Sequence, residues 1–249
     1  PALHFRASRK ASRSCAVSSG FLPEKYLSAS SSPGAAATDP ANPWDYSRWP
    51  AELVPMFQRA LDAAMQTGTR LVLCDNLYAY GIPDGPLTET SPLRPHGPKG
   101  RARQEGAELL MRAHELGEVK VAIGRAADFF GPGVDSTPTK MLFGNAVQGK
   151  SVRLFGTGDT LHSVSFIEDV GRGLVTLAEH DEAFGQVWHL PVAPPMTEQA
   201  WVRRIVELAG TGVSVSTTAP GPAPLEQARG VGAAPFSARR AAQPTRSPN

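Results

Sequence analysis

Three side chains in the middle of the chain have the chemistry of a reaction centre: Asn76, His96 and Lys99. Asn76 follows the apolar run 71–74, so its amide would lie in the loop after a buried strand, where it could orient a substrate carbonyl. His96 is of a residue type that can act as a general acid or base near neutral pH. Lys99 could hold a ribose or lower the pKa of a neighbour. Each also has an ordinary explanation (loop capping, an exposed imidazole, a solvated charge), and the residues alone leave both open.

Aromatic and polar side chains accompany these candidates in two strand-end loops. Tyr78 and Tyr80 follow Asn76, and the segment from Gly124 to Gly133 again runs from a strand into a Gly/Pro loop. In α/β proteins, ligands bind just outside the carboxyl ends of the strands. Two such loops separated by one helix therefore predict a ligand site.

Two other polar groups give weaker signals. Lys99, Arg101 and Arg103 crowd the predicted start of a helix, where positive charge is electrostatically unfavourable. This crowding indicates either a ligand contact or a solvated run of charge. The segment Gly156-Thr-Gly-Asp159, near His162, lacks the third glycine and the following helix of a dinucleotide motif, so it is typical of a turn between strands.

The hydrophobic periodicity predicts strands and helices in alternation, which favours an α/β fold with a mostly parallel, doubly wound sheet. Pro50 suits the first position of a helix, and Gly68 suits its C-terminal cap. Helices are expected over 50–67, about 101–116, near 140–148, from 168 onward and over 198–209. Strands are expected over 69–74, 119–123, 152–155, 164–167 and 187–190.

The composition describes a globular middle between two polar flanks. Of the 249 residues, 41% are apolar and 19% are charged, and the apolar residues concentrate between about 44 and 210. The net charge of +2 comes from the flanks, and no basic cluster favours binding to nucleic acid. No apolar run is long enough to span a membrane. Cys15 and Cys74 have no metal-ligand spacing, so we expect a cytoplasmic protein without a metal site.

Several segments occur in an order that is typical of one family. They are Leu71-Val-Leu-Cys-Asp-Asn-Leu-Tyr-Ala-Tyr-Gly81, Pro86-Leu-Thr-Glu-Thr-Ser-Pro92, Gly124-Arg125 with Phe130-Gly-Pro-Gly133, Leu154-Phe-Gly-Thr-Gly158, Val164-Ser-Phe-Ile-Glu-Asp-Val170 and Gly185-Gln-Val-Trp-His-Leu-Pro191. Together they span roughly 41–209 and resemble the extended short-chain dehydrogenase/reductases, the NAD-dependent epimerase/dehydratase family, particularly its atypical members. The resemblance implies a partial, Rossmann-like parallel sheet with a smaller C-terminal substrate subdomain. It also implies an NAD or NADP cofactor and a small or sugar-like substrate.

The resemblance assigns roles to individual residues. Asn76 stands where the family has its catalytic serine, His96 where it has its tyrosine and Gly100 where it has its lysine, with Lys99 displaced by one. In this assignment His96 carries the proton and Asn76 orients the substrate oxygen. The cofactor side would be lined by Asn42, Tyr78 and Arg125, and the substrate side by Tyr80, Phe129 and His162.

The chain lacks two motifs of the family. The Tyr-x-x-x-Lys pair is absent, and no glycine-rich loop that could cradle a pyrophosphate precedes residue 41, where only Gly20 and Gly34 occur without a predicted strand. Both flanks are what a truncated or frame-shifted gene would produce. The expected parts are a disordered or unrelated flank (1–40), a remnant of the NAD(P)-binding domain (41–135), a substrate-binding subdomain (136–210) and a disordered tail (211–249).

Two functions follow from these departures. One is an atypical NAD(P)-dependent enzyme, and the other is a non-catalytic family member or binding module that cannot hold the dinucleotide. A sheet that lacks strands exposes an apolar edge, so self-association is also expected.

Overall fold

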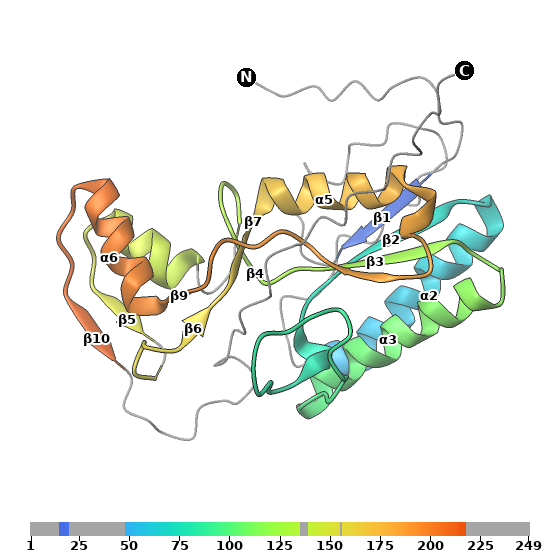
Figure 1. Cartoon of the computed structure of the whole chain (residues 1–249), viewed down its shortest axis with the longest axis horizontal. Coiled ribbons are helices and arrows are strands. Elements are labelled where there is room, and N and C mark those ends of the chain that lie inside the picture. Colours follow the sequence, from blue (N-terminus) through green and yellow to red (C-terminus); the bar gives the residue numbers. More distant parts are fainter. Residues whose placement is uncertain (1–14, 20–47, 135–138, 155, 218–249) are drawn as a thin grey trace, which may run out of the picture.

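The main sheet has four parallel strands in the order β1-β2-β3-β8, with helices on both faces (Figure 1). A computed structural model of the chain describes residues 15–19, 48–134, 139–154 and 156–217. The strands of the main sheet are β1 (Cys15–Ser19), β2 (Arg70–Asp75), β3 (Val121–Arg125) and β8 (Val187–His189). This layered arrangement confirms the predicted α/β fold with a parallel, doubly wound sheet.

β2 is buried along its whole length because both faces of the sheet are covered. Leu71 and Leu73 pack in the core beneath the helices of one face, whereas Val72 and Cys74 pack in the core on the other face. A continuous apolar run is typical of a parallel strand between two helical layers. The predicted strand over 69–74 is therefore confirmed with a shift of one residue.

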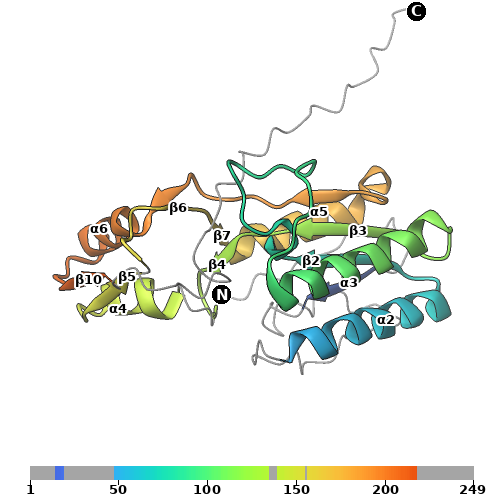
Figure 2. The same ribbon diagram turned by 90° about the horizontal axis from the view of Figure 1, so that it is seen from below.

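Two long helices, α2 (Trp49–Thr67) and α3 (Gly97–Glu115), lie side by side on one face of the sheet (Figure 2). α2 ends at Gly68, whose left-handed φ of 65° closes the C-terminus of the helix as predicted. The two helices approach each other closely at Gly106, where a Cβ atom would lie 2.1 Å from Cδ2 of Phe57. This glycine therefore sets the distance between the helices.

α3 begins at Gly97, about one turn before the predicted start near 101, so that prediction was wrong. Pro98 occupies the first turn, where its missing N–H removes no helical hydrogen bond. The earlier start places Lys99 in the first turn and buries both Gly100 and Arg103 against the sheet.

The opposite face of the sheet is covered by α5 (Ile167–Glu179), whose Val170 and Leu174 pack in the second core. The chain continues through the short 3-10 helix η3 (Asp181–Ala183) into β8 and so returns to the main sheet. α5 and β8, which lie within the predicted substrate-binding subdomain 136–210, therefore belong with the main sheet.

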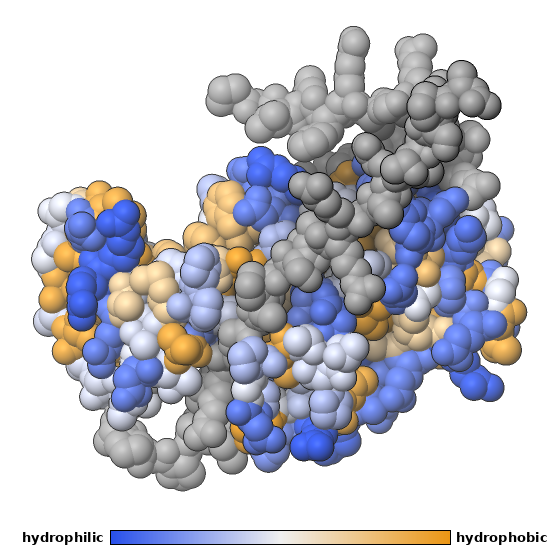
Figure 3. Space-filling view, viewed as in Figure 1, coloured by the Kyte–Doolittle hydropathy of each residue, from blue (hydrophilic) through white to orange (hydrophobic). Residues whose placement is uncertain are grey.

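A smaller group of elements lies beside the sheet, and a hollow separates the two on the face shown in Figure 3. Its elements are η2 (Thr139–Gly144), α4 (Asn145–Val147), β5 (Val152–Leu154), α6 (Glu198–Ala209) and β10 (Val215–Thr217). η2, α4, β5 and α6 share a core of their own, which includes Leu142, Val202 and Ile205, whereas β10 is exposed. α6 begins after Thr197, whose Oγ1 accepts the N–H of Ala200 at 3.1 Å, and ends at Gly210 as predicted.

Two short ladders join this group to the sheet. β4 (Asp128–Phe130) pairs in parallel with β7 (Val164–Phe166), and β6 (Leu161–His162) pairs antiparallel with β9 (Met196–Thr197). Four aromatic rings meet at the same junction, with centroids 5.3 to 6.1 Å apart: Phe130, Phe143, Phe166 and Trp201. The predicted turn at 156–159 links β5 to β6.

Both flanks contain a strand that the sequence did not reveal. Cys15–Ser19 pairs with β2, and Val215–Thr217 pairs with β5. The predicted disordered tail over 211–249 is therefore wrong for Val215–Thr217, and the flank over 1–40, predicted to be disordered or unrelated, contributes Cys15–Ser19 to the sheet. Strands this short are formed by pairing with a neighbouring strand and leave no periodic pattern in the sequence. The rest of both flanks lies outside the described residues. No helix in the described part is long and apolar enough to cross a membrane.

Candidate active site

β2 ends at Asp75, and the chain turns through Asn76 into the short 3-10 helix η1 (Tyr78–Tyr80). The Oδ1 atom of Asn76 accepts the backbone N–H of Tyr78 at 3.0 Å, which commits the carbonyl oxygen of this amide to the turn. The amide nitrogen remains able to donate. Asn76 can therefore offer an N–H group to a ligand oxygen, but it cannot act as a base.

Close backbone packing joins this turn to the residues that precede α3. Gly81 has a φ of 73°, and a Cβ atom there would lie 1.9 Å from the carbonyl oxygen of Arg94 and 3.4 Å from the nitrogen of His96. Only glycine permits this conformation and this approach without strain. His96 itself is exposed, directly before the first turn of α3. Asn76 and His96 thus border the same turn.

Gly100, where the resemblance expects a lysine, packs directly against the turn. A Cβ atom at Gly100 would lie 2.8 Å from the carbonyl oxygen of Tyr78 and 3.1 Å from Cβ of Pro95. A longer side chain fits there only if the turn moves. Lys99, half-buried in the same helical turn, places its positive charge one position earlier.

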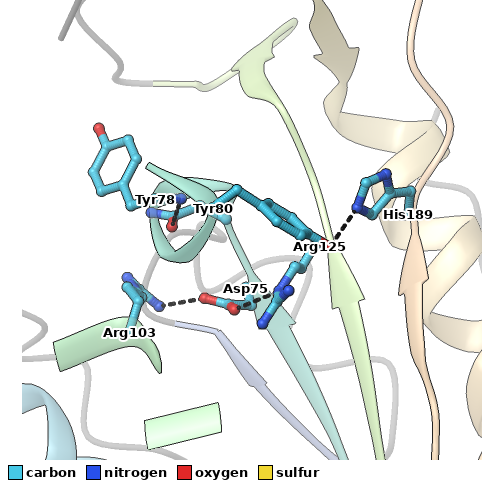
Figure 4. Close-up of polar contacts among 7 residues, drawn as sticks. Asp75, Tyr78, Tyr80, Arg103, Arg125 and His189 are labelled. Carbon is cyan, nitrogen blue, oxygen red and sulfur yellow. Dashed lines mark hydrogen bonds and ion pairs between the residues drawn. The ribbon is translucent and has the colours of Figure 1, made fainter. Parts of the chain in front are cut away.

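Beneath the turn, Asp75 forms ion pairs with two arginines (Figure 4). Nη1 of Arg103 lies 3.3 Å from Oδ1 of Asp75, and Nε of Arg125 lies 3.1 Å from Oδ2. Asp75 and Arg103 are 0% exposed and Arg125 is 3% exposed. Burial tends to lower the pKa of Arg125, but Asp75 and Tyr80 outweigh it and the pKa is raised. Arg125 is therefore charged, and the two ion pairs with Asp75 make this burial possible.

Each arginine also lies over an aromatic ring. The guanidinium carbon of Arg103 is 4.4 Å from the ring centre of Trp49, and that of Arg125 is 4.8 Å from the ring centre of Tyr80. Such stacking is favourable because the ring face carries partial negative charge. The network consequently ties α2, α3, β2, β3 and η1 together at the carboxyl end of the sheet.

The hydroxyl of Tyr80 lies 2.8 Å from Nε2 of His189, at the end of β8. The backbone N–H of His189 donates to the carboxylate of Glu89 at 2.9 Å. Burial raises the pKa of Tyr80. Burial also lowers the pKa of His189; Glu89 opposes this effect and Arg125 adds to it. Both side chains are therefore uncharged near neutral pH, and the imidazole tautomer decides which of the two donates.

His162 lies at the junction with the smaller group, where its Nε2 is 2.7 Å from Oδ2 of Asp128. Burial tends to lower the pKa of His162, but the carboxylates of Asp128 and Glu198 outweigh it and the pKa is raised. Phe129 is 8% exposed and packs in the core beneath α5. Its ring therefore fills the interior of the protein in this structure.

The structure brings some of the predicted site residues together and separates others. Four of them border the turn after β2: Asn76, Tyr78, His96 and Lys99. Two contact each other beneath it: Tyr80 and Arg125. Phe129 and His162 lie in other surroundings, and Asn42 lies outside the described residues.

Sequence reasoning missed the partners of this network. An acid such as Asp75 at the end of a wholly apolar strand is itself a signal, because a buried carboxylate needs a cationic partner. Of the two explanations for Arg103, the solvated charge is wrong because the side chain is fully buried. His189 gave no local signal; only the pairing of β3 with β8 sets it opposite Arg125.

The described residues fit a dinucleotide in part. Asn76 and Lys99 can donate hydrogen bonds to ribose hydroxyls, and Tyr78 presents a half-buried ring. Arg125 does not fit as a cofactor contact, because it is buried against Asp75. Gly100 leaves no room for a lysine unless the turn moves.

Known proteins resemble this chain in sequence. A model of the NAD dependent epimerase/dehydratase family matches residues 33–190. The chain is 28% identical over 153 residues to uncharacterized protein y4nL of Sinorhizobium fredii, and 25% identical over 141 residues to a dTDP-glucose 4,6-dehydratase of Streptomyces niveus. These alignments cover 59% and 55% of this chain but 41% of each relative. The chain thus spans about two fifths of the length of these relatives.

The fold is similar to a solved structure as well. The crystal structure of a dTDP-glucose 4,6-dehydratase from Streptomyces venezuelae, which contains NAD, matches with a TM-score of 0.65 and 21% identity. The match covers 77% of this chain and 59% of that one. At this level of identity the similarity concerns the fold alone, and it agrees with the Rossmann-like arrangement of the sheet.

Proposed function

Because this chain belongs to the NAD-dependent epimerase/dehydratase family, we propose that it is an NAD(P)-dependent oxidoreductase of this kind with an atypical active site. Its substrate would be small or sugar-like. Similarity to proteins named dTDP-glucose 4,6-dehydratase supports a sugar-like substrate. Because the chain spans only part of these proteins, its activity and its cofactor are both part of the proposal.

The observation that carries the proposal is the set of polar groups around the turn between β2 and α3. The amide nitrogen of Asn76 can donate a hydrogen bond, whereas its carbonyl oxygen already accepts the N–H of Tyr78. His96 follows the close contact between Gly81 and Arg94, and Lys99 lies in the first turn of α3. A donor, a titratable imidazole and a cation at one strand end can polarise a carbonyl and move a proton.

The proposed chemistry gives each of these residues one task. Asn76 would donate a hydrogen bond to the reacting oxygen of the substrate. His96 would take up the proton that this hydroxyl loses, and Lys99 would hold a ribose of the cofactor. A bound nicotinamide would supply the hydride acceptor.

Calorimetric titration with NAD⁺ and NADP⁺ tests the proposal. We expect measurable binding that is weakened in the Lys99→Met variant. Lys120→Met is the matched control, because Lys120 is exposed and precedes β3 at the opposite end of the sheet. Absence of binding at millimolar concentrations of both nucleotides would refute the enzymatic function. If the cofactor binds and a candidate sugar reduces it, unchanged turnover in His96→Ala would remove His96 from the chemistry.

One observation favours a second function, a binding module without catalysis. A Cβ atom at Gly100 would lie 2.8 Å from the Tyr78 carbonyl oxygen, so the turn occupies the space that the family lysine would need. A protein with this packing could bind a sugar-like ligand without holding a dinucleotide. The same titrations distinguish the two functions: the binding module takes up a sugar-like ligand but neither nucleotide.

A further inference from the structure

The loop over residues 82–95, which connects η1 to α3, is held by contacts at its base and near its middle. At the base, Gly81 lies against the Arg94 carbonyl. Near the middle, the Glu89 carboxylate accepts the N–H of His189 at 2.9 Å, and Leu87 beside it is 5% exposed. The loop therefore follows β8 at one point and the turn after β2 at another.

Tyr80 connects these two points of contact. Its hydroxyl is bound by the His189 imidazole at 2.8 Å, and its ring lies under the Arg125 guanidinium at 4.8 Å. Arg125 is in turn held by Asp75 at 3.1 Å. Figure 4 shows Tyr80 between these partners, while the ring of Tyr78 points the other way. Tyr80 is thus the side chain that joins the turn to β8.

We propose that Tyr80 and His189 are positioning residues, which hold Asn76 and His96 at a fixed separation through their buried hydrogen bond. Asn76 begins the turn and His96 follows the loop, so both move if this bond is lost. The catalytic importance of the separation between Asn76 and His96 rests on the proposed function. The restraint that Tyr80 and His189 place on this separation does not.

Acid should weaken the restraint. A protonated His189 could only donate to the hydroxyl of Tyr80, and it would add a second buried positive charge beside Arg125. The charged groups near His189 are Arg125 on β3, Asp75 behind it on β2 and Glu89 on the loop. Asp75 is already shared by two arginines, so Glu89 is the carboxylate left to oppose the new charge.

Hydrogen–deuterium exchange of the backbone amides tests the proposal, because it measures the restraint without any ligand. After correction for intrinsic rates, Tyr80→Phe and His189→Leu should each raise exchange within 76–96 roughly five- to tenfold, as loss of one buried hydrogen bond implies. His189→Gln keeps an acceptor and should restore protection at neutral pH. Wild type should lose protection in 76–96 as the pH drops below 6.5 toward the lowered pKa of His189, and His189→Gln should not.

Two variants serve as controls. Asp84→Asn changes a charge in the same loop, and His180→Gln removes an exposed imidazole at the end of α5; neither should alter exchange in 76–96. Wild-type exchange in Tyr80→Phe would overturn the proposal. The proposal would also be overturned if amide exchange in β3 rose as much as in 76–96, because this would indicate general destabilisation. It would be overturned as well if His189→Gln still lost protection in acid.

The nucleotide titrations keep the two proposals apart. If wild type binds neither NAD⁺ nor NADP⁺ but shows the expected exchange pattern, the enzymatic function fails and the positioning pair stands. If a nucleotide binds and Tyr80→Phe exchanges like wild type, only the positioning pair fails.

Discussion

At the scale of single residues, Asp75 neutralises two buried arginines. We expect Asp75→Asn to lower the free energy of unfolding by about 3–5 kcal/mol, since it leaves two buried guanidinium groups without their carboxylate. Urea denaturation measures the change. Asp169→Asn, which alters an exposed pair with Arg172, should cost less than about 1 kcal/mol. Equal effects of the two variants would contradict this role of Asp75.

Cys74 is expected to be chemically inert in the folded protein. Burial, with the help of Asp75, raises the pKa of its thiol from 9.0 to about 12. The thiolate is the reactive form, so its fraction at mildly alkaline pH should be roughly a thousandfold lower than at the ordinary pKa. In a Cys15→Ser background, an aromatic disulfide reagent should label Cys74 only after urea is added. Rapid labelling of the native protein would show that Cys74 is more accessible than the structure indicates.

Two histidines should give stability opposite dependences on pH. The pKa of His162 is raised above 6.5, so its contribution is complete below 6.5 and is lost as the pH rises through the folded value. The pKa of His189 is lowered, so stability falls as the pH drops below 6.5 toward its folded value. His162→Gln should remove the alkaline loss and His189→Gln the acid loss, as measured by urea denaturation across this pH range. Identical pH profiles for the two variants would disprove the assignment.

At the scale of elements, apolar periodicity predicted most of the helices and strands between residues 50 and 209. It succeeded for β2 and α6 because burial on both faces, or on one face, leaves a direct pattern in the residue types. It failed for β1 and β10, because strands of five and three residues are too short for such a pattern. It also placed the start of α3 one turn late, since Pro98 within the first turn resembles a boundary.

The contact between α2 and α3 gives a prediction at this scale. A Cβ atom at Gly106 would lie 2.1 Å from the ring of Phe57, so Gly106→Ala should destabilise the protein by about 1–3 kcal/mol through overpacking. Gly171 is the matched control: it lies within α5 and has nothing within 4 Å of an added Cβ atom. Gly171→Ala should stabilise by up to about 1 kcal/mol through helix propensity. Thermal unfolding should therefore show shifts of opposite sign, and shifts of the same sign would contradict the packing.

At the scale of the whole molecule, the edge of the main sheet bears on self-association. β1 pairs with β2, and among the described residues no strand pairs with its other side. Unpaired strand edges favour association with other chains. We therefore expect self-association in sedimentation velocity that increases with protein concentration. A single monomeric species at every concentration, with cooperative melting, would contradict this expectation.

The sequence by itself determined the family, the parallel α/β fold and the strand end that carries Asn76. Strand burial and motif order can be recognised from residues that are neighbours in the sequence. Only the tertiary structure decided which polar residues are buried together. The partners of Asp75 lie 28 and 50 residues away, and Tyr80 and His189 are 109 residues apart. No local pattern links such residues, and only the adjacent strands and the packing of α3 bring their charges close enough to neutralise one another.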